Sequence, residues 1–296
     1  MTPFAIAGVQ MYVGHGDNLE AMRHRLKLLL HLYPWVQMVL FSELCVFGPG
    51  LARAQRLPGP AEEELRGMAA EFGIWLVPGS LYESRDGRIY NTTPVIDPGG
   101  NVIARYRKMF PFLPLEEGVA AGDTFCVFDV PGAGRFAVLN CYDIWFPETM
   151  RTVTAMGAEV ILHPVMTHTI DRDVDINVAK ASAAIFQAYV FDINGAGGGG
   201  IGQSCVIDPA GHVLHQAGGA EELMPVEIDF DQVRRQRVRG MRTMGQPLKS
   251  FRDSEVRFGV YAEGADRQYL DTLGPLQKPQ RDLAAAAPAV EALAAE

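Results

Sequence analysis

The sequence predicts a mixed α/β fold, and specifically a four-layer α-β-β-α sandwich in which two sheets pack face to face between outer helices. The first observation is that short apolar runs, typical of strands, alternate with segments of helical periodicity. The second is an internal repeat, because residues 96–103 and 207–214 each place an Asp-Pro-x-Gly turn between two apolar runs. Equivalent hairpins in the two halves of the chain indicate two similar sheets.

The elements follow from these patterns in chain order. The predicted strands span residues 5–11, 38–42, 74–78, 93–97, 102–106, 126–130, 136–141, 159–163, 188–194, 204–208, 213–216 and 224–229. The predicted helices span residues 18–31, 61–72, 147–156, 177–187 and 231–237. Beyond Leu276 the composition changes to Pro, Ala and Glu. We therefore expect one domain over residues 1–270 and a tail over 271–296 that is partly ordered or forms an arm on a partner subunit.

Composition narrows the function classes. With 296 residues, 48% of them hydrophobic, the chain can bury a full core. A net charge of -9 disfavours nucleic acid and anionic membranes as partners, so we expect a small-molecule partner. The start of the chain lacks a signal-type pattern and no apolar run approaches membrane-spanning length, which predicts a cytoplasmic protein. The four cysteines lack CxxC or Cys/His ligand spacing, so neither disulfides nor structural zinc is indicated. We expect no metal or other cofactor.

The segment around Cys141 is the strongest candidate for chemistry. It joins an apolar strand over residues 135–139 to a predicted helix, in which Pro147 suits the first turn and Gly157 suits the position just past the end. A cysteine on a strand-to-helix turn can expose its sulfur, and the following backbone N–H groups can face an oxyanion. The alternative is that Cys141 is a small buried hydrophobe, as most free cysteines are.

Two charged residues lie in settings that match. Glu43 ends the apolar run 38–42, where a carboxylate is costly unless it has a partner or a role. Its structural alternative is an ion pair that holds the loop. Lys108 lies at the end of the run 102–107, where a solvated strand end is the plain interpretation.

A second carboxylate candidate lies in the apolar, proline-rich segment 110–118. Glu116 is the residue we favour there, because such surroundings keep a carboxylate ordered. A solvated loop carboxylate is the alternative.

Taken together, Glu43, Lys108 and Cys141 resemble the Glu-Lys-Cys triad of the nitrilase superfamily of carbon-nitrogen hydrolases. The resemblance covers residues 4–260, and three motifs in series make it specific. It implies the α-β-β-α sandwich of that family, a carbon-nitrogen hydrolase domain over residues 1–270, and a homodimer or larger homo-oligomer. Glu116 matches the family's second glutamate. This chain carries one extra residue beside the Pro-Ile-Glu-Gly segment of aliphatic amidases, so Glu117 remains a competitor.

The resemblance also implies roles. A thiol with an ordinary pKa of ~8.5 is mostly protonated at neutral pH. Glu43 is therefore expected to act as general base while Cys141 attacks the carbonyl carbon to form a thioester. Lys108 and the backbone N–H of Tyr142 are the expected donors to the oxyanion, and Glu116 is expected to hold the substrate amine and support Lys108.

The residues after the cysteine favour an amide as substrate. True nitrilases typically follow the cysteine with Trp-Glu, whereas this chain has Tyr142 and Asp143. Carbamoylases and ω-amidases often place an arginine just after Cys-x-Asp, where this chain has Ile144 and Trp145. A substrate carboxylate therefore lacks its usual anchor.

The predicted pocket is mostly apolar or neutral, which suits a small neutral amide. Its expected wall residues are Tyr142, Trp145, Phe146, Met166 and His168. Arg172 or Arg242 could supply a carboxylate anchor from elsewhere. His163 and His168 are interpreted as loop or pocket-wall histidines, because nothing near them completes a metal-ligand set.

Other functions stay open at this stage. The alternatives are a nitrilase that converts a nitrile to acid and ammonia, an N-carbamoyl amidohydrolase, an acyltransferase on the same triad, and a binding protein with a silenced site. The presence of Glu43, Lys108 and Cys141 together argues against silencing.

Overall fold

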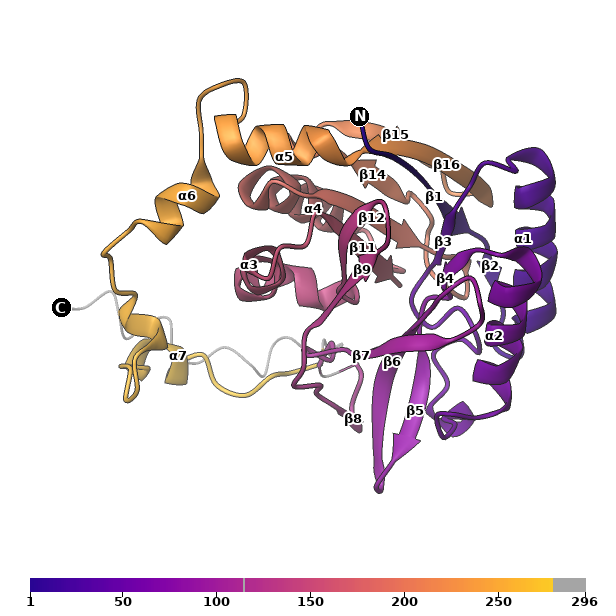
Figure 1. Cartoon of the computed structure of the whole chain (residues 1–296). Helices are drawn as coiled ribbons and strands as arrows, with labels where there is room; N and C mark the ends of the chain where they lie inside the picture. Colours follow the sequence, from indigo (N-terminus) through magenta and orange to yellow (C-terminus); the bar gives the residue numbers. More distant parts are fainter. Residues whose placement is uncertain (114, 279–296) are drawn as a thin grey trace. The chain divides into compact units, whose positions relative to one another are not determined.

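The computed structural model describes residues 1–113 and 115–278 (Figure 1). The chain divides into two compact units, one made of residues 1–111 and 118–254 and the other of residues 112–117 and 255 onward. The domain boundary expected at residue 270 stays a prediction. Most of the expected tail, residues 279–296, lies outside the described residues.

In the described part of the chain, the strands of the first unit form two large sheets and one short pair. The eight-stranded sheet runs in the order β16 (Glu222–Asp229), β1 (Pro3–Gln10), β3 (Met38–Phe41), β4 (Trp75–Val77), β6 (Arg88–Ile96) and β5 (Leu81–Arg85), with β7 (Val102–Arg107) and β8 (Val119–Ala120) also paired to β6. The six-stranded sheet runs in the order β15 (Val213–Gln216), β14 (Cys205–Ile207), β12 (Tyr189–Asn194), β11 (Val160–Val165), β10 (Gly134–Val138) and β9 (Cys126–Val130). The short pair joins β2 (Tyr12–Val13) to β13 (Ala196–Gly197).

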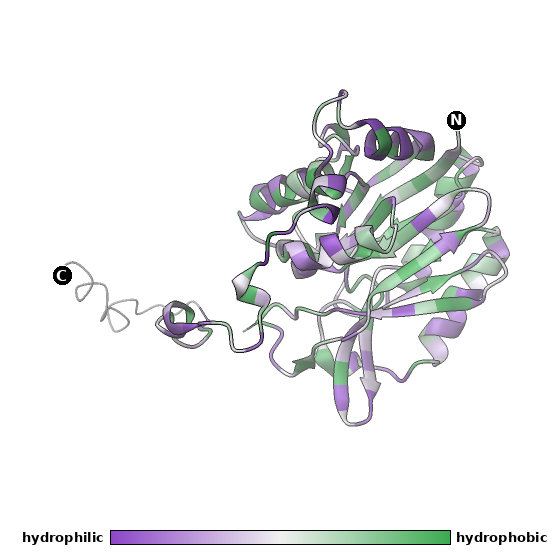
Figure 2. Cartoon of the chain, turned by 60° about the vertical axis from the view of Figure 1, so that its left-hand side comes forward, coloured by the Kyte–Doolittle hydropathy of each residue, from purple (hydrophilic) through white to green (hydrophobic). Residues whose placement is uncertain are grey.

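Helices cover the outer face of each sheet (Figure 1). The helices of this unit are α1 (Leu19–Leu32), α2 (Pro60–Phe72), α3 (Pro147–Ala155), α4 (Arg172–Phe186), α5 (Phe230–Arg239) and α6 (Pro247–Arg252), with short 3₁₀ turns η1 (Leu51–Arg53) and η2 (Cys141–Trp145). In Figure 1, α1 and α2 lie beyond the eight-stranded sheet, whereas α3 and α4 lie on the other side of the six-stranded sheet. The helices carry both hydrophobic and hydrophilic segments in Figure 2, as amphipathic outer layers should.

Alternation along the strands places the core in separate layers. On β1 and β3, Val9 and Phe41 pack with Leu26 of α1. The residues between them along the strands, such as Ile6 and Leu40, point the other way and pack with the six-stranded sheet. Because side chains alternate between the two faces of a strand, one sheet serves both a helix layer and a sheet layer.

The two sheets approach closely at Gly8. A Cβ atom built on Gly8 would lie 2.3 Å from Cδ1 of Ile193 on β12 and 2.8 Å from Cε of Met224 on β16. A residue with a side chain would therefore push these neighbours out of contact. Glycine at this strand position follows from the close packing of the two sheets.

The predicted sandwich is confirmed, and so are both hairpins that led to it. Residues 96–103 join β6 to β7 in the eight-stranded sheet, and residues 207–214 join β14 to β15 in the six-stranded sheet. In each hairpin the aspartate N–H donates to the carbonyl four residues later, Asp97 to Asn101 and Asp208 to His212, both at 2.9 Å. The repeated motif thus marks one hairpin in each sheet.

Two of the elements that differ from the predictions do so for the same physical reason. Helix α4 begins at Arg172 rather than at residue 177, and its first turns bury Arg172 and Asp175. Strand β5 was not predicted, and it buries Glu83, which is paired with Arg107 at 2.8 Å. A search for apolar periodicity misses elements that bury paired charges.

The second unit contains only short described elements. They are η3 (Gly259–Tyr261) and α7 (Gln268–Asp271). None of the helices among the described residues is both long and apolar enough to span a membrane.

The layer assignment predicts unequal roles for two leucines of α1. Leu26 is fully buried against the first sheet, whereas Leu28 is 39% exposed on the opposite side of the helix. Leu26→Ala should lower the free energy of unfolding by about 2–5 kcal/mol through lost burial and a cavity. The matched control Leu28→Ala should change it by less than about 0.5 kcal/mol. Urea titration followed by circular dichroism measures both, and equal losses would contradict the layer assignment.

Candidate active site

Glu43 and Lys108 form a buried ion pair at the ends of two strands of one sheet. Glu43 lies two residues after β3 and is 2% exposed, and Lys108 directly follows β7 and is 1% exposed. Lys108 Nζ lies 2.8 Å from Glu43 Oε1. The same oxygen accepts a hydrogen bond from Asn91 Nδ2 at 2.8 Å. Two donors therefore hold one oxygen of the carboxylate in place.

Backbone contacts tie these residues to neighbouring strands. The Glu43 N–H donates to the Val165 carbonyl at 3.2 Å, which connects the end of β3 to the end of β11 in the other sheet. The Lys108 N–H donates to the Asn91 carbonyl at 2.9 Å. Both sheets thus contribute to the position of the ion pair.

Cys141 opens the 3₁₀ turn η2, three residues after β10 ends at Val138. The predicted strand ran through residue 141, but Cys141 has φ +46°, a left-handed conformation that a strand cannot accommodate. The turn is held by reciprocal hydrogen bonds between Asn140 and Asp143. Non-glycine residues with positive φ often occur at functional sites.

Asp143 clamps the cysteine turn to the segment after Lys108. Its Oδ2 accepts from the Asn140 N–H at 2.9 Å and from the Tyr106 hydroxyl at 2.6 Å. Its Oδ1 accepts from the Phe110 N–H at 2.8 Å. Burial raises the pKa of Asp143, while the Tyr106 hydroxyl and the Lys108 charge oppose this effect. This buried carboxylate joins two loops that the sequence separates widely.

The environment of Cys141 keeps its sulfur protonated. The residue is partly exposed, but desolvation around the sulfur, followed by the negative charge of Glu43, raises the pKa of the thiol well above its ordinary value. The Lys108 charge and the Met166 N–H act in the opposite direction without reversing the shift. Attack by this sulfur at neutral pH therefore requires a base that removes its proton.

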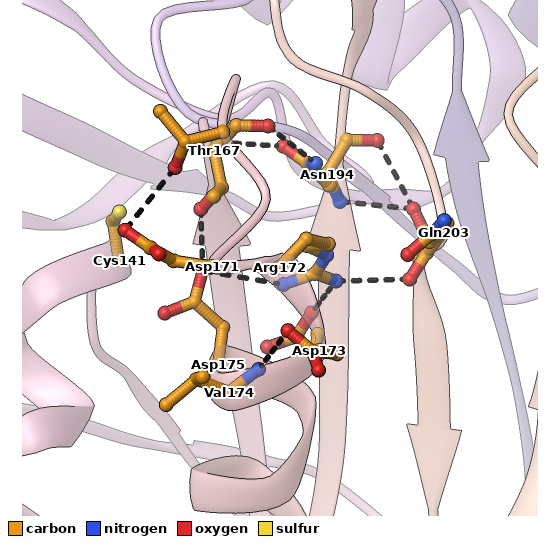
Figure 3. Close-up of polar contacts among 12 residues, drawn as sticks. Cys141, Thr167, Asp171, Arg172, Asp173, Val174, Asp175, Asn194 and Gln203 are labelled. Atoms are coloured by element: carbon orange, nitrogen blue, oxygen red, sulfur yellow. Dashed lines mark hydrogen bonds and ion pairs between the residues drawn. The ribbon is translucent and has the colours of Figure 1, made fainter.

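A second buried network contacts Cys141 from the six-stranded sheet. His163 Nε2 lies 2.9 Å from the Cys141 carbonyl oxygen, and His163 Nδ1 lies 2.9 Å from Asp192 Oδ2. Arg172 pairs with the other oxygen of Asp192. Arg172 also donates to the Gln203 carbonyl at 3.1 Å (Figure 3). All three charged side chains are almost fully buried.

Sequence reasoning missed this network. It interpreted His163 as a loop or pocket-wall residue and offered Arg172 as an anchor for a substrate carboxylate. Instead, His163 is buried on β11, and the guanidinium of Arg172 is paired with Asp192. The one signal in the sequence was Asp192 itself, a carboxylate in the middle of the apolar run 189–193.

Aromatic side chains gather beside the cysteine turn. Phe146 stacks on Phe110, with ring centroids 3.6 Å apart, and Tyr142 meets the edge of Phe146 at 5.1 Å. Trp145 lies 6.0 Å from Tyr142 and donates through its indole N–H to Asp175 at 3.0 Å. Three of the predicted wall residues, Tyr142, Trp145 and Phe146, thus form one aromatic cluster.

The remaining predicted site residues have different settings. Met166 is partly buried, and its N–H faces the sulfur of Cys141. His168 is exposed two residues further along the chain, and Arg242 is exposed on a loop. The structure gives neither His168 nor Arg242 a contact with Cys141.

Glu116 and Glu117 both belong to the second unit. The carboxylate of Glu116 accepts from the Phe112 N–H at 2.6 Å, whereas that of Glu117 lies 3.4 Å from Lys278 Nζ. Glu116 thus forms a local hydrogen bond with a backbone N–H four residues earlier, whereas Glu117 forms an ion pair with a distant residue of the same unit. The choice of Glu116 as the second glutamate stays a prediction.

Among the described residues, no cluster of three or more His, Cys, Asp and Glu side chains has a metal-binding arrangement. The side chains around Cys141 instead form hydrogen bonds and ion pairs with one another.

Comparison with known proteins gives a consistent result. Residues 17–238 match the family model of the carbon-nitrogen hydrolases. Omega-amidase NIT2 from Xenopus tropicalis is 28% identical over 202 residues, which is 60% of this chain and 70% of the relative. The human omega-amidase NIT2 is 29% identical over 192 residues, which is 60% of this chain and 69% of the relative.

Solved structures agree with the sequence relatives. A cysteine-to-serine variant of the Nesterenkonia AN1 amidase superposes with a TM-score of 0.70 at 26% identity and covers 79% of this chain and 95% of its own. Nit3 from Saccharomyces cerevisiae superposes with a TM-score of 0.74 at 24% identity, covers 80% of this chain and 93% of its own, and supports the fold alone. The family model spans most of the sandwich, so this chain belongs to the carbon-nitrogen hydrolase family, in the amidase-like branch of the nitrilase superfamily.

Proposed function

We propose that the protein hydrolyses a small, neutral carboxylic amide to an acid and ammonia or an amine through a thioester on Cys141. The observation that carries the proposal is the buried ion pair of Glu43 and Lys108, whose charges both act on the Cys141 thiol. Two structures of a glutamate-to-glutamine variant of the Nesterenkonia AN1 amidase, 25–26% identical to this chain, contain covalent adducts at the active site cysteine. Both adducts are alkylations of the sulfur, so this precedent supports a nucleophilic cysteine at the corresponding site, and the thioester is our proposal for this chain.

Acylation begins with proton transfer. Since the raised pKa keeps the Cys141 thiol protonated, Glu43 takes the proton as the sulfur attacks the carbonyl carbon. The contacts from Lys108 and Asn91 to one oxygen of Glu43 fix the carboxylate for this step. Glu43 then returns the proton to the departing amine.

The tetrahedral intermediate carries a negative oxygen that needs donors. Lys108 provides a cation, and the backbone N–H of Tyr142 provides a dipole at the start of η2. Loss of one such donor typically costs about 10²–10³ in rate. Glu43 next activates a water that hydrolyses the thioester. Glu116 stays the residue that the family resemblance predicts to hold the substrate amine.

Two observations favour a neutral substrate. The aromatic cluster of Tyr142, Trp145 and Phe146 gives the cysteine turn an apolar neighbour. Arg172, one of the two candidate anchors for a carboxylate, is already paired with Asp192. The similar Nesterenkonia amidase supports the same preference, because its cysteine-to-alanine variant has been solved in complex with butyramide, a neutral amide.

The second candidate is an ω-amide that carries a carboxylate. It is favoured by the relatives named omega-amidase NIT2, which are 28–29% identical to this chain. Nitrile hydrolysis, carbamoyl hydrolysis and acyl transfer on the same triad remain alternatives, and each differs from amide hydrolysis in the molecule it consumes or releases.

We further propose a homodimer or larger homo-oligomer in the cytoplasm. Apolar side chains of α4 and of the segments beside it are exposed, among them Ile170, Val174, Ile185 and Phe251. Clusters of exposed apolar residues are typical of subunit interfaces.

Replacing Glu43 with Gln tests the general-base role. The variant keeps the size of the side chain but cannot take the Cys141 proton, so kcat should fall by about 10²–10⁴-fold. Ammonia release from butyramide measures the rate, and Cys141→Ala defines the floor.

Two controls accompany this test. Cys126→Ala, a buried cysteine on β9, should keep close to wild-type activity. Wild-type-like turnover by Glu43→Gln, or a thioester accumulating on it at the wild-type rate by intact mass, would contradict the proposed base.

A panel of matched four-carbon substrates tests the substrate class. Butyramide should be hydrolysed with a kcat/KM at least about tenfold above that of succinamate, because a carboxylate buried without a counterion is costly. Butyronitrile should give little or no ammonia. Faster turnover of succinamate would favour an ω-amide as substrate. Release of ammonia from butyronitrile would indicate a nitrilase. Formation of a hydroxamate as the main product when hydroxylamine is added would indicate an acyltransferase.

A further inference from the structure

The peptide group between Cys141 and Tyr142 has two ends with different partners. Its carbonyl oxygen, on Cys141, lies 2.9 Å from Nε2 of His163. Its N–H, on Tyr142, is the proposed donor to the substrate oxyanion. Because a trans peptide is planar and its C=O and N–H point in opposite directions, a group that fixes the carbonyl also fixes the direction of the N–H.

The contacts of His163 define its protonation state. Nε2 faces the Cys141 carbonyl oxygen, which can only accept a hydrogen bond, and Nδ1 faces a carboxylate oxygen of Asp192 at 2.9 Å. Burial raises the pKa of Asp192, but the charge of Arg172, its buried ion-pair partner, is the largest opposing effect, and the pKa falls to about 2, so Asp192 is ionised at neutral pH. Both ring nitrogens of His163 must therefore carry hydrogen, which makes the ring a cation.

The charges around His163 support this assignment. The groups that face the network are Asp192 on β12, Arg172 and Asp175 on α4, the Cys141 thiol on η2 and the Cys205 thiol on β14. Burial lowers the pKa of His163 and Arg172 repels its charge, but the hydrogen bond and charge of Asp192 raise the pKa above its ordinary value. Two cations thus share the single carboxylate of Asp192, and one of them is directed at the Cys141 carbonyl.

We propose that His163, held as an imidazolium by Asp192, is a positioning residue that orients and polarises the Cys141–Tyr142 peptide so that its N–H stabilises the oxyanion. A charged donor is roughly twice as strong as a neutral one, and hydrogen bonds in series polarise one another. The contact also helps to hold the left-handed backbone of Cys141. The inference rests on the proposed function, because it concerns the oxyanion of an amide carbonyl.

His163→Gln removes the positive charge and leaves a neutral side chain that can still donate to the carbonyl. We expect kcat for butyramide to fall by about 10–100-fold with KM changed less than about threefold, since the oxyanion forms only after binding. The matched control is His212→Gln, which removes an exposed histidine 3.2 Å from Asp208 in the β14–β15 hairpin. That control should retain wild-type kcat.

A second measurement separates polarisation from simple support of the cysteine. Methyl methanethiosulfonate reacts with a thiolate at sulfur and releases methanesulfinate, so no carbonyl oxyanion forms. In the His163→Gln variant, the reagent should modify Cys141 at close to the wild-type rate, whereas the rate of amide turnover should fall. Equal losses of both rates would mean that His163 merely holds the nucleophile, and no loss of either would mean that it is dispensable. Either result overturns the inference.

Asp192→Asn tests the source of the charge through pH. Removal of the carboxylate lowers the pKa of His163, so the ring loses its proton as pH rises through the assay range. Activity of the variant should therefore decline at a lower pH than that of the wild type, with near-normal activity restored toward acidic pH. A pH profile that keeps the wild-type shape in a folded variant would overturn the role of Asp192.

Nitrogen-15 NMR of histidine-labelled wild type gives a test that needs no folded variant. We expect the His163 ring to show two protonated nitrogens from pH 6 to 8, and a neutral tautomer in that range would overturn the inference. The proposed function fails separately, if the wild type releases no ammonia from any amide. Amide turnover in the wild type combined with full kcat in His163→Gln overturns only the role of His163.

Discussion

Lys108 and Glu43 form a buried ion pair at the ends of strands β7 and β3 of the eight-stranded sheet, and the arrangement of the candidate site depends on this pair. Desolvation of two charges is expensive, and removal of either partner typically costs about 3–5 kcal/mol because the other charge is left unpaired. The 2.8 Å contact and the further donor from Asn91 offset that cost in the folded chain. The same two charges act in opposite directions on the Cys141 thiol, whose pKa stays high because desolvation and Glu43 dominate. The pair therefore places a base and a cation beside a protonated nucleophile.

The sandwich is what assembles this pair with the cysteine. Glu43 and Lys108 follow strands of one sheet, whereas Cys141 and His163 come from the other. Contacts between the Glu43 N–H and the Val165 carbonyl, and from Phe110 to Asp143, connect the loops of the two sheets. Because each loop is anchored by a buried polar group, the candidate site is held by both halves of the chain. A change in the packing of the sheets would alter the geometry of the site.

Local pattern predicted the layers and the strand-end positions of Glu43 and Lys108 but not the buried network of His163, Asp192 and Arg172. The two Asp-Pro-x-Gly hairpins and the strand-end positions of Glu43 and Lys108 are visible in short segments, so the sequence predicts them without tertiary information. The buried network forms only in the folded chain, where it brings together His163, Asp192 and Arg172. Each of these polar residues lies on a helix or strand that is predicted from its apolar residues. The left-handed turn at Cys141 is likewise held by Asn140 and Asp143, which have the spacing of a capping box but carry Asp where Glu or Gln is usual. Burial of paired charges is therefore the feature that apolar periodicity cannot anticipate.

The central claim is that the sulfur of Cys141 carries the acyl group during turnover. The most direct measurement is acid quenching of the wild-type protein during butyramide hydrolysis, followed by peptide mapping by mass spectrometry. The account predicts a butyryl mass increase on the peptide that contains Cys141, with none on the peptides of Cys45, Cys126 and Cys205. Sustained ammonia release with no acyl adduct on Cys141, or with the adduct on another residue, would contradict the account.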